Sequence, residues 1–433
     1  MAEKIYNKNL NVYEASVERI DFIFKNFDKI YLSFSGGKDS GVMLNMVLDY
    51  MRKHKIEKKI GLMTLDNEAN YNYSLEFMHK IIQENLDLLD VYWCCLPITL
   101  PCTVSSYMTE WQCWGEDDKE RWIRPMPDNE YIVNINNHKF DFFYENMNYD
   151  EFWDEFGNWY SEGERCACLI GIRTDESLNR FRAIMNERKQ TLGGHMWTKK
   201  NTDTVYNCYP IYDWRTDDVW VANAKFGWEY NELYDIFWKA GLTVAQMRVA
   251  SPFMSESKSS LNLYRVIDAQ VWQRLCARVQ GANFVATYGK QLSYRSFKIP
   301  EGHTWKSFTK FLLDTLPKEV GENFKMRFIQ SIKFWWRVGR GLSEDVIQEL
   351  KENGIDFKIG EKTRHGNQDK DCVRMLPPDH LDMLKRHPGE VTSWKRFALT
   401  ILKNDHTCKY MGLAPTKEQA IRQREIMKKY KNI

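Results

Sequence analysis

The sequence lacks the features that identify membrane, exported and highly charged proteins. No run of apolar residues approaches the 18 that a transmembrane helix needs. The first ten residues, MAEKIYNKNL, contain no apolar signal core, so export is not expected. The 61 Lys and Arg residues nearly balance the 59 Asp and Glu residues, which leaves a net charge of +2 and no overall field that would attract nucleic acid or membranes. We therefore expect a cytoplasmic globular protein.

Several familiar catalytic and metal-binding motifs are also missing. The chain has no G-x-x-x-x-G-K-[ST] loop, so the usual P-loop transfer of a γ-phosphate is not indicated. Its nine histidines show no His-x-x-Glu-His spacing, and its ten cysteines include no two C-x2-C pairs. Ten cysteines in 433 residues do not indicate a disulfide scaffold, so we expect thiols, metal ligands or redox groups.

The length of 433 residues exceeds one ordinary hydrophobic core and indicates two or three domains. Over the first 250 residues, short β-rich runs alternate with helical patterns, which is typical of an α/β fold with a doubly wound, mainly parallel sheet. The predicted strands cover 30–34, 60–65, 91–96, 168–172 and 205–211, and the predicted helices cover 13–27, 42–51 and 73–89, with one more beginning at Thr174.

Two regions depart from this alternation. Residues 97–165 are rich in Trp, Phe and Tyr, and we interpret them as an insertion over the functional edge of the sheet that packs as a small core. Beyond about residue 255 the pattern becomes mostly helical. We therefore expect an α/β domain over 1–255 and a mostly helical domain over 256–433, with a polar loop at 354–369.

The strongest motif is the segment 32–40, Leu-Ser-Phe-Ser-Gly-Gly-Lys-Asp-Ser, between a predicted strand and a predicted helix. Adjacent glycines permit a tight turn whose backbone N–H groups can surround phosphate oxygens at a helix N-terminus. Ser35 and Ser40 add hydroxyl groups, Lys38 adds positive charge, and Asp39 can orient the loop or hold Mg²⁺. The segment predicts an anion-binding loop.

Two later motifs also pass from a predicted strand to a predicted helix. Residues 171–177, Gly-Ile-Arg-Thr-Asp-Glu-Ser, place Arg173 at the carboxyl end of a strand, where open α/β sheets bind ligands. An arginine there can contact a phosphate or an anionic leaving group, and Thr174 is a candidate helix N-cap. Residues 209–220, YPIYDWRTDDVW, form the other motif, with Thr216 as a candidate cap.

The SGGKDS segment resembles the PP-loop of adenine-nucleotide α-hydrolases, which have a HUP-like fold and split ATP between the α and β phosphates. Together with the two later motifs, in the same order over about residues 25–250, it resembles the phosphoadenosine phosphosulfate reductase superfamily, which includes the ATP sulfurylase small subunit. The resemblance implies ATP and Mg²⁺ as cofactors, and catalytic roles for Lys38, Asp39 and Arg173. It implies nucleotide contacts from Ser33, Ser35, Gly36, Gly37, Lys38, Asp39, Ser40, Leu65, Asp66, Gly171 and Arg173.

The intact loop is more similar to ATP-splitting members than to sulfonucleotide reductases. We therefore expect an adenylyltransferase that acts on an oxyanion or nucleic-acid acceptor, in sulfurylase-like or sulfur-transfer chemistry. A phosphoadenosine phosphosulfate reductase is an alternative, although its C-terminal nucleophile has only Cys408, in His-Thr-Cys-Lys-Tyr, as a counterpart. The region around Trp394-Lys-Arg-Phe resembles the bacterial and phage subgroup typified by immunoglobulin-binding regulator A. That resemblance implies a ParB-like partner and leaves a nucleotide-sensing regulator as a further alternative.

The cysteines and the C-terminal tail give two weaker signals. Six cysteines lie between 94 and 168, and Cys113, Cys166 and Cys168 are candidates for zinc or an iron-sulfur cluster, with buried thiols and redox or persulfide chemistry as the competing interpretations. Residues 401–433 carry eight Lys or Arg against three Asp or Glu. This basic tail is either a solvated helix or a contact for nucleic acid or an acidic protein.

Overall fold

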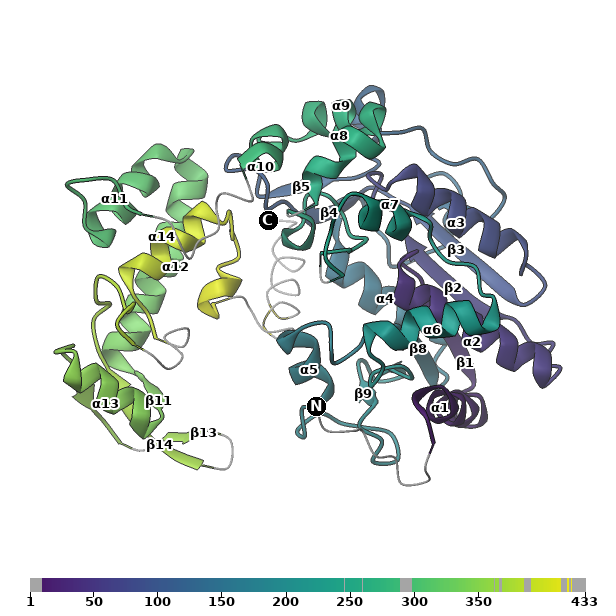
Figure 1. Cartoon of the computed structure of the whole chain (residues 1–433), viewed down its shortest axis with the longest axis horizontal. Helices are drawn as coiled ribbons and strands as arrows, with labels where there is room; N and C mark the ends of the chain where they lie inside the picture. Colours follow the sequence, from purple (N-terminus) through teal and green to yellow (C-terminus); the bar gives the residue numbers. More distant parts are fainter. Residues whose placement is uncertain are drawn as a thin grey trace. The chain divides into compact units, whose positions relative to one another are not determined.

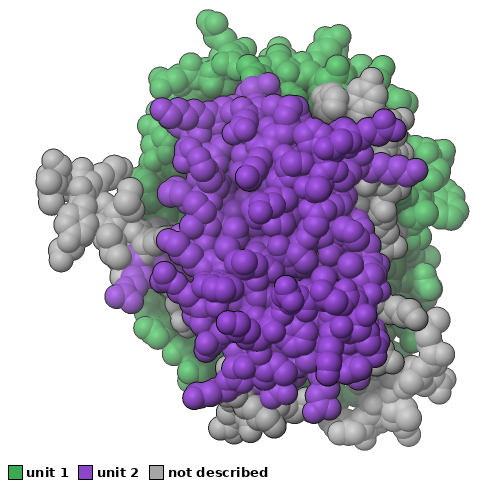
Figure 2. All heavy atoms as spheres, turned by 90° about the vertical axis from the view of Figure 1, so that its left-hand side faces the viewer, with its two compact units in different colours: residues 1–101, 110–289 green, residues 102–109, 290–433 purple. Residues whose placement is uncertain are grey.

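The computed structural model describes residues 10–413, apart from 245, 259, 289–297, 362, 366–367 and 385–390, together with 419 and 422. The chain forms two compact units (Figures 1 and 2). Unit 1 comprises residues 1–101 and 110–289, and unit 2 comprises residues 102–109 and 290–433. The expected boundary at residue 255 differs from this division, because residues 256–289 cluster with unit 1. Among the described helices, none combines the length and apolar content that a membrane crossing requires.

Unit 1 contains a seven-stranded sheet in the order β6-β3-β2-β1-β8-β10-β9. The neighbouring strands pair in parallel except at the β10 and β9 edge, which is antiparallel. This agrees with the predicted doubly wound, mainly parallel sheet. The strands are β1 (Lys29–Ser33), β2 (Ile60–Leu65), β3 (Leu89–Cys95), β6 (Ile132–Asn134), β8 (Cys166–Ile170), β9 (Thr198–Lys200) and β10 (Val205–Cys208).

The strand order reverses between β1 and β8. From β1 the chain moves to β2 and β3, then returns to β8 on the other side of β1 and continues to β10. Successive parallel strands joined by right-handed crossovers place their helices on opposite faces when the direction reverses. The crevice beyond the carboxyl ends of β1 and β8 is therefore the topological switch point, where such sheets bind ligands.

Helices cover both faces of this sheet (Figure 1). Helix α1 contacts α2, and α2 contacts α6, whereas α4 packs against the face that Tyr31 presents, through a ring contact of 5.4 Å between Tyr31 and Phe156. Helix α1 starts at a capping box in which Asn11 and Glu14 exchange side-chain to backbone hydrogen bonds. The helices that accompany the sheet are α1 (Val12–Asn26), α2 (Lys38–Lys53), α3 (Asn72–Gln83), α4 (Tyr149–Ser161), α5 (Leu178–Ile184), α6 (Thr216–Phe226) and α7 (Leu233–Lys239).

The aromatic-rich region 97–165 is only partly an insertion. A small sheet forms from β4 (Ile98–Pro101), β5 (Glu110–Gln112) and β7 (Met147–Asn148), next to the 3-10 helix η1 (Glu116–Arg121). However, β6 joins the main sheet, and α4 is the crossover helix that leads to β8. The aromatic rings of α4 therefore help form the core against the main sheet. The expectation that the whole region lies over the functional edge is wrong.

The end of unit 1 packs on the loop that follows β2. Tyr264 stacks on Tyr71 with ring centroids 3.6 Å apart, and the Tyr264 hydroxyl donates a hydrogen bond to the Ala69 carbonyl at 3.0 Å. These contacts explain why residues beyond 255 belong to the α/β unit. The segment contains η2 (Ser255–Ser257), η3 (Leu261–Leu263), α8 (Tyr264–Ile267), α9 (Ala269–Arg278) and α10 (Ala282–Tyr288).

Unit 2 is helical with a small antiparallel sheet. In this sheet β14 pairs with β11, β12 and β13, so the expectation of a loop throughout 354–369 is wrong. One buried cluster includes Trp335, Leu350 and Val373, and another includes Phe324 and Phe328. The elements are α11 (Trp305–Thr315), α12 (Lys318–Arg337), β11 (Arg340–Leu342), α13 (Glu344–Glu352), β12 (Lys358–Ile359), β13 (Thr363–His365), β14 (Gln368–Arg374), α14 (Trp394–Leu402) and η5 (Lys409–Met411).

Residues 102–109 leave unit 1 between β4 and β5 and belong to unit 2. Within unit 2, the Ser106 hydroxyl donates a hydrogen bond to Asn404 Oδ1 at 3.0 Å, and His406 Nε2 lies 3.0 Å from the Ser105 carbonyl. Most of the basic tail predicted at 401–433 lies outside the described residues.

Candidate functional site

The predicted anion-binding loop connects β1 to α2 at the switch point. Strand β1 ends at Ser33, which is half-buried, and α2 starts at Lys38. Gly36 has φ +67°, in the left-handed region, and a Cβ there would lie 2.6 Å from Met78 Sδ. The residue after this turn, Gly37, is the N-cap of α2. The loop therefore needs glycine at 36 for both conformation and space, as the sequence motif predicted.

Hydrogen bonds within the loop bring its donors together. The Ser35 and Ser40 hydroxyls lie 3.0 Å apart, and Ser40 Oγ also accepts a hydrogen bond from the Ser35 backbone N–H at 3.3 Å. Ser40 Oγ in turn donates to the Gly37 carbonyl at 3.1 Å. Two hydroxyls and several N–H groups thus gather at the N-terminus of a 16-residue helix, where the helix dipole favours an anion.

Residues far along the chain hold the loop from outside. The Lys38 backbone N–H donates to the Tyr234 hydroxyl at 3.0 Å. Asn231 Nδ2 donates to the Gly36 carbonyl at 2.9 Å and to Ser74 Oγ at 2.9 Å. Asn231 and Tyr234 belong to the turn around the start of α7, which sequence reasoning missed. A single polar residue in such a turn gives no signal of its own.

Three charged side chains meet beside the loop, all of them buried. Arg173 Nε donates to Asp39 Oδ1 at 2.6 Å, and Lys38 Nζ lies 3.2 Å from Asp39 Oδ2. Arg173 is only 1% exposed, and its Nη1 is buried without a hydrogen-bond partner among the described residues, with Asp175 Oδ2 at 3.7 Å. Two cations thus share one carboxylate, and an unpaired buried N–H is costly. An incoming anion would supply the missing partner.

The pKa of Lys38 also indicates that the site favours an anion. Burial lowers the pKa of Lys38, the neighbouring Arg173 and Arg248 lower it further, and Asp39 opposes both effects. The charged form of Lys38 is therefore less favourable than in water, and an anion bound nearby would stabilise it.

Two more arginines contact Glu176 of the second motif. Glu176 Oε2 accepts a hydrogen bond from the Arg173 backbone N–H at 3.2 Å and forms an ion pair with Arg180. Arg248 Nη2 donates to the Glu176 carbonyl at 3.1 Å. Arg248 lies beyond all three motifs, so sequence reasoning missed it. Thr174 is not a cap: its N–H and hydroxyl both donate to the Tyr212 carbonyl, and the N-cap of α5 is Ser177.

Gly171 brings the second motif against the loop. A Cβ at Gly171 would lie 2.8 Å from the Asp39 carbonyl oxygen and 2.9 Å from Ser40 Cα. Only glycine therefore allows the end of β8 to approach the first turn of α2 this closely. This contact, together with the hydrogen bond between Arg173 and Asp39, joins the two motifs into one site.

Asp66 has a different environment from the one expected of a nucleotide contact. It is 1% exposed, its Oδ2 accepts a hydrogen bond from Trp93 Nε1 at 2.7 Å and pairs with Arg124, and its Oδ1 accepts from the Glu68 N–H at 2.9 Å. These contacts turn the carboxylate into the protein. The half-buried Leu65 ends β2 at the same sheet edge as the loop, and its contact with adenosine stays a prediction.

Each carboxylate oxygen of Asp39 already contacts a cation, Oδ1 with Arg173 and Oδ2 with Lys38, so in this structure Asp39 serves to hold these two side chains. Residues of this site therefore fit a phosphate better than a metal ion. Among the described residues, no three His, Cys, Asp or Glu side chains gather in a way that could hold a metal. Cys113, Cys166 and Cys168 thus do not form the expected zinc or iron-sulfur site. Each is a buried thiol whose pKa is raised by burial, to about 12 for Cys168.

Two protein-family models match successive parts of this chain. The family described as phosphoadenosine phosphosulfate reductase domain matches residues 123–239, and the family described as domain of unknown function (DUF3440) matches residues 241–422. The Escherichia coli (strain K12) protein YbdN, described as uncharacterized, is 30% identical over 427 residues, which cover 95% of this chain and 92% of YbdN. The chain belongs to the YbdN family of the phosphoadenosine phosphosulfate reductase-like superfamily. This superfamily consists of PP-loop enzymes that bind nucleotides.

Solved structures give a weaker likeness to this YbdN-family chain. The Candida glabrata FMN adenylyltransferase in complex with FMN and an ATP analogue is 15% identical, with a TM-score of 0.32, and the match covers 52% of this chain and 59% of that chain. The Candida auris phosphoadenylyl-sulfate reductase is 13% identical, with a TM-score of 0.26, over 55% and 94% of the two chains. The Methanococcus maripaludis U34-tRNA thiolase NcsA with its [4Fe-4S] cluster is 14% identical, with a TM-score of 0.30, over 64% and 80%. Likeness at this level carries no information on the substrate.

Proposed function

We propose that this YbdN-family protein binds ATP at the loop 35–40 and transfers its adenylyl group to an oxyanion acceptor. The observation that carries the proposal is the buried trio of Lys38, Asp39 and Arg173 at the start of α2, in which Arg173 Nη1 lacks a hydrogen-bond partner among the described residues. The trio fits a polyphosphate, because phosphate oxygens accept charge-assisted hydrogen bonds from both cations.

In this reaction an acceptor oxygen forms a bond to the α-phosphorus of ATP. The bond from that phosphorus to the bridging oxygen of the β-phosphate breaks, and its electron pair leaves with pyrophosphate. Lys38, Arg173 and the loop N–H groups would hold the pyrophosphate and stabilise the charge that develops on the bridging oxygen. An acceptor that is already ionised requires no general base, which agrees with a site that presents cations and hydroxyls.

Asp39 has a positioning role in this account. Its carboxylate fixes the guanidinium of Arg173 through the 2.6 Å hydrogen bond and keeps Lys38 Nζ within 3.2 Å. Both cations would then already be oriented before ATP arrives, so less entropy is lost on binding. ATP would enter as its Mg²⁺ complex, with the metal held by the phosphates.

The sulfonucleotide reductase alternative receives little support from the structure. Cys408, the counterpart of the reductase nucleophile, is buried in unit 2 in the apolar cluster of Phe324 and Phe328. Burial raises its pKa to about 12, so the reactive thiolate is disfavoured at neutral pH. The ATP-splitting reaction needs no cysteine and is therefore the better match.

The proposal is tested by incubating the protein with Mg²⁺ and ATP labelled at the α-phosphate, together with sulfate, carboxylate and nucleic-acid acceptors. We expect labelled AMP or an adenylylated acceptor, with pyrophosphate in equal amount. Arg173→Ala and Lys38→Ala should each lower the rate at least about 100-fold, whereas Arg182→Ala, which removes an exposed cation of α5, should not. Release of ADP and phosphate, or ATP binding without products under all conditions, would contradict the proposal. The second result would favour a nucleotide sensor.

A further inference from the structure

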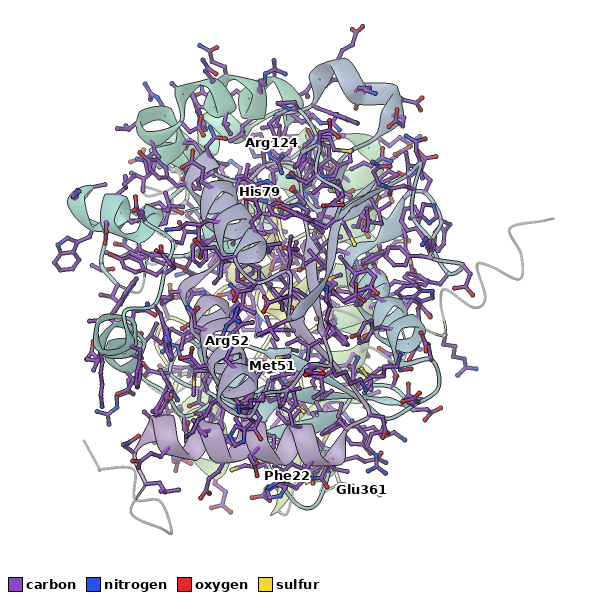
Figure 3. All side chains as sticks on the ribbon, turned by 90° about the vertical axis from the view of Figure 1, so that its right-hand side faces the viewer. Phe22, Met51, Arg52, His79, Arg124 and Glu361 are labelled. Carbon is purple, nitrogen blue, oxygen red and sulfur yellow. The ribbon has the colours of Figure 1, made fainter. Side chains whose placement is uncertain are left out.

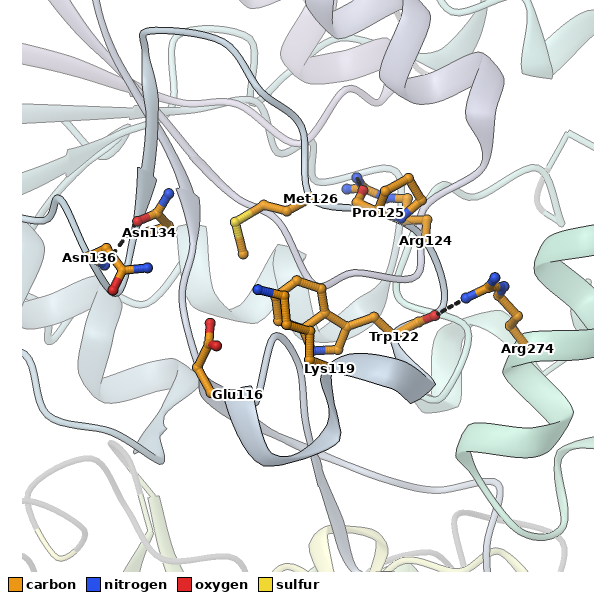
Figure 4. Close-up of a pocket in the computed structure, with 9 residues that line it drawn as sticks. All are labelled: Glu116, Lys119, Trp122, Arg124, Pro125, Met126, Asn134, Asn136 and Arg274. Atoms are coloured by element: carbon orange, nitrogen blue, oxygen red, sulfur yellow. Dashed lines mark hydrogen bonds between the residues drawn. The ribbon is translucent and has the colours of Figure 1, made fainter.

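Unit 1 contains a pocket of about 650 Å³ that no motif indicated (Figure 4). Its walls come from η1 and the segment after it, from the end of β6, and from α9. The volume lies within the range of pockets that bind small organic molecules. Helix α9 lies in the part of the chain that matches DUF3440, so the pocket joins residues from both family matches.

The pocket has a rigid aromatic wall. Trp122 is 6% exposed, its Nε1 donates a hydrogen bond to the Gly115 carbonyl at 2.9 Å, and its ring meets the edge of Trp114 at 5.0 Å and 84°. Behind this wall, Arg124 is fixed by its ion pair with Asp66 and lies over the Trp114 ring at 5.0 Å. A wall held in this way can stack against a planar ring with little loss of side-chain entropy.

Exposed cations stand at the mouth of the pocket. Lys119 Nζ lies 5.5 Å from the Trp122 ring centroid, and Arg274 Nη1 donates to the Trp122 carbonyl at 2.8 Å. Glu116 is the one acidic residue of the lining, and Asp66 already neutralises Arg124. Within the part of the chain that the structure describes, Lys119 and Arg274 form no ion pair, so the lining carries an excess of positive charge. Such a lining favours an anion.

The pocket opens at the same sheet edge as the phosphate loop. Asn134, which lines it, ends β6, and β6 is three strands from β1 in the sheet order. At about 4.8 Å per strand, the pocket lies roughly 14 Å along the edge from the loop. The ion pair between Arg124 and Asp66, at the end of β2, occupies the interval between them.

We propose that this pocket binds an aromatic or heteroaromatic organic anion, packed against Trp122 and held by Lys119 and Arg274. Binding of this anion does not depend on the proposed function, because the pocket is separate from the loop. Asn134 and Asn136 add amide groups at the wall opposite Arg274 (Figure 4), which suits a ring with polar substituents.

The test measures binding of 1-naphthoate and 1-naphthyl phosphate to the full chain by isothermal titration. We expect saturable binding of at least one probe, weaker binding of cyclohexanecarboxylate, and a loss of about 10-fold in affinity in Lys119→Ala and in Arg274→Ala. Arg52→Ala is the matched control, since Arg52 is an exposed cation at the C-terminal end of α2, well away from Arg124 in Figure 3. The Arg52→Ala variant should bind both probes with the affinity of the wild type.

Separate measurement of ATP binding distinguishes this inference from the proposed function. Lys119→Ala and Arg274→Ala should retain ATP binding, and Lys38→Ala should lose ATP binding but retain the naphthoate affinity. Two results would overturn the inference: no saturable binding of either probe to the wild type, or equal affinity in the wild type and both pocket variants. Naphthyl phosphate that is displaced by ATP and lost only in Lys38→Ala would assign the phosphate probe to the loop. In that case the naphthoate affinities of the wild type and the two pocket variants would decide whether the pocket binds an anion.

Discussion

Replacing Gly171 with alanine should separate the two motifs of the site. The added Cβ would lie 2.8 to 2.9 Å from three backbone atoms of Asp39 and Ser40, whereas carbon contacts are favourable near 3.5 Å. The end of β8 and the start of α2 must therefore move apart by about 0.6 Å, because backbone cannot rotate away as a side chain can. Overpacking of this kind costs about 1–3 kcal/mol of folding stability.

The same movement would stretch the hydrogen bond between Arg173 and Asp39, which spans the two motifs. Because a hydrogen bond to a charged group contributes about 1.5–3 kcal/mol, partial loss of this one should make Gly171→Ala bind ATP about 10-fold more weakly. Titration calorimetry with ATP and Mg²⁺ measures this, and thermal unfolding measures the stability. Gly41→Ala, in the first turn of α2, is the control. Its Cβ would lie 3.4 Å from Cζ of Phe77 in α3, which is an ordinary van der Waals contact, so ATP binding should be unchanged. Wild-type affinity in Gly171→Ala would refute the reasoning.

Three further predictions follow from the charged groups and the thiols. ATP affinity should fall as the pH rises toward 10.5, because the folded-state pKa of Lys38 lies below that ordinary value. Over the same range the unfolded state binds more protons, so the free energy of unfolding should rise. Lys38→Arg should remove the loss of ATP affinity, since arginine stays charged, and a flat profile in the wild type would contradict this. Asp66→Asn should destabilise the fold by about 3–5 kcal/mol in urea unfolding, because it leaves Arg124 buried without its carboxylate. Asp87→Asn, which breaks the exposed pair with Arg52, should cost about 1 kcal/mol or less, and equal costs would refute the distinction. Native protein should expose one thiol to a disulfide reagent, that of Cys276, because the other nine cysteines are buried; rapid reaction of several would contradict the structure.

The sequence predicted the parts of the fold that depend on local pattern. Strand 60–65 and helix 13–27 agree with β2 and α1 within a residue, because a short apolar run marks the strand and the helical spacing of apolar residues marks the helix. The loop 35–40 was predicted for a similar reason, since two adjacent glycines followed by lysine have few other uses.

Long-range packing decided the features that the sequence did not show. Asn231 and Tyr234 reach the loop only because α7 folds back over it, and Arg248 reaches Glu176 from outside any motif. Asp66 follows a strand at the expected edge, yet its environment depends on Arg124, 58 residues away. Of the three cysteine candidates for a metal site, Cys166 and Cys168 lie on β8 of the main sheet, whereas Cys113 follows β5 of the small sheet, and spacing alone gave no indication of that.

The central claim is that the loop 35–40 grips the pyrophosphate portion of ATP. A crystal structure with Mg²⁺ and an ATP analogue that carries a methylene group between the α and β phosphates tests it most directly. We predict the β and γ phosphates against the Ser35 and Ser40 hydroxyls, within hydrogen-bond distance of Lys38 and Arg173, with the α-phosphate facing outward along the sheet edge. An analogue bound elsewhere, or one whose phosphates make no contact with Arg173, would contradict the account.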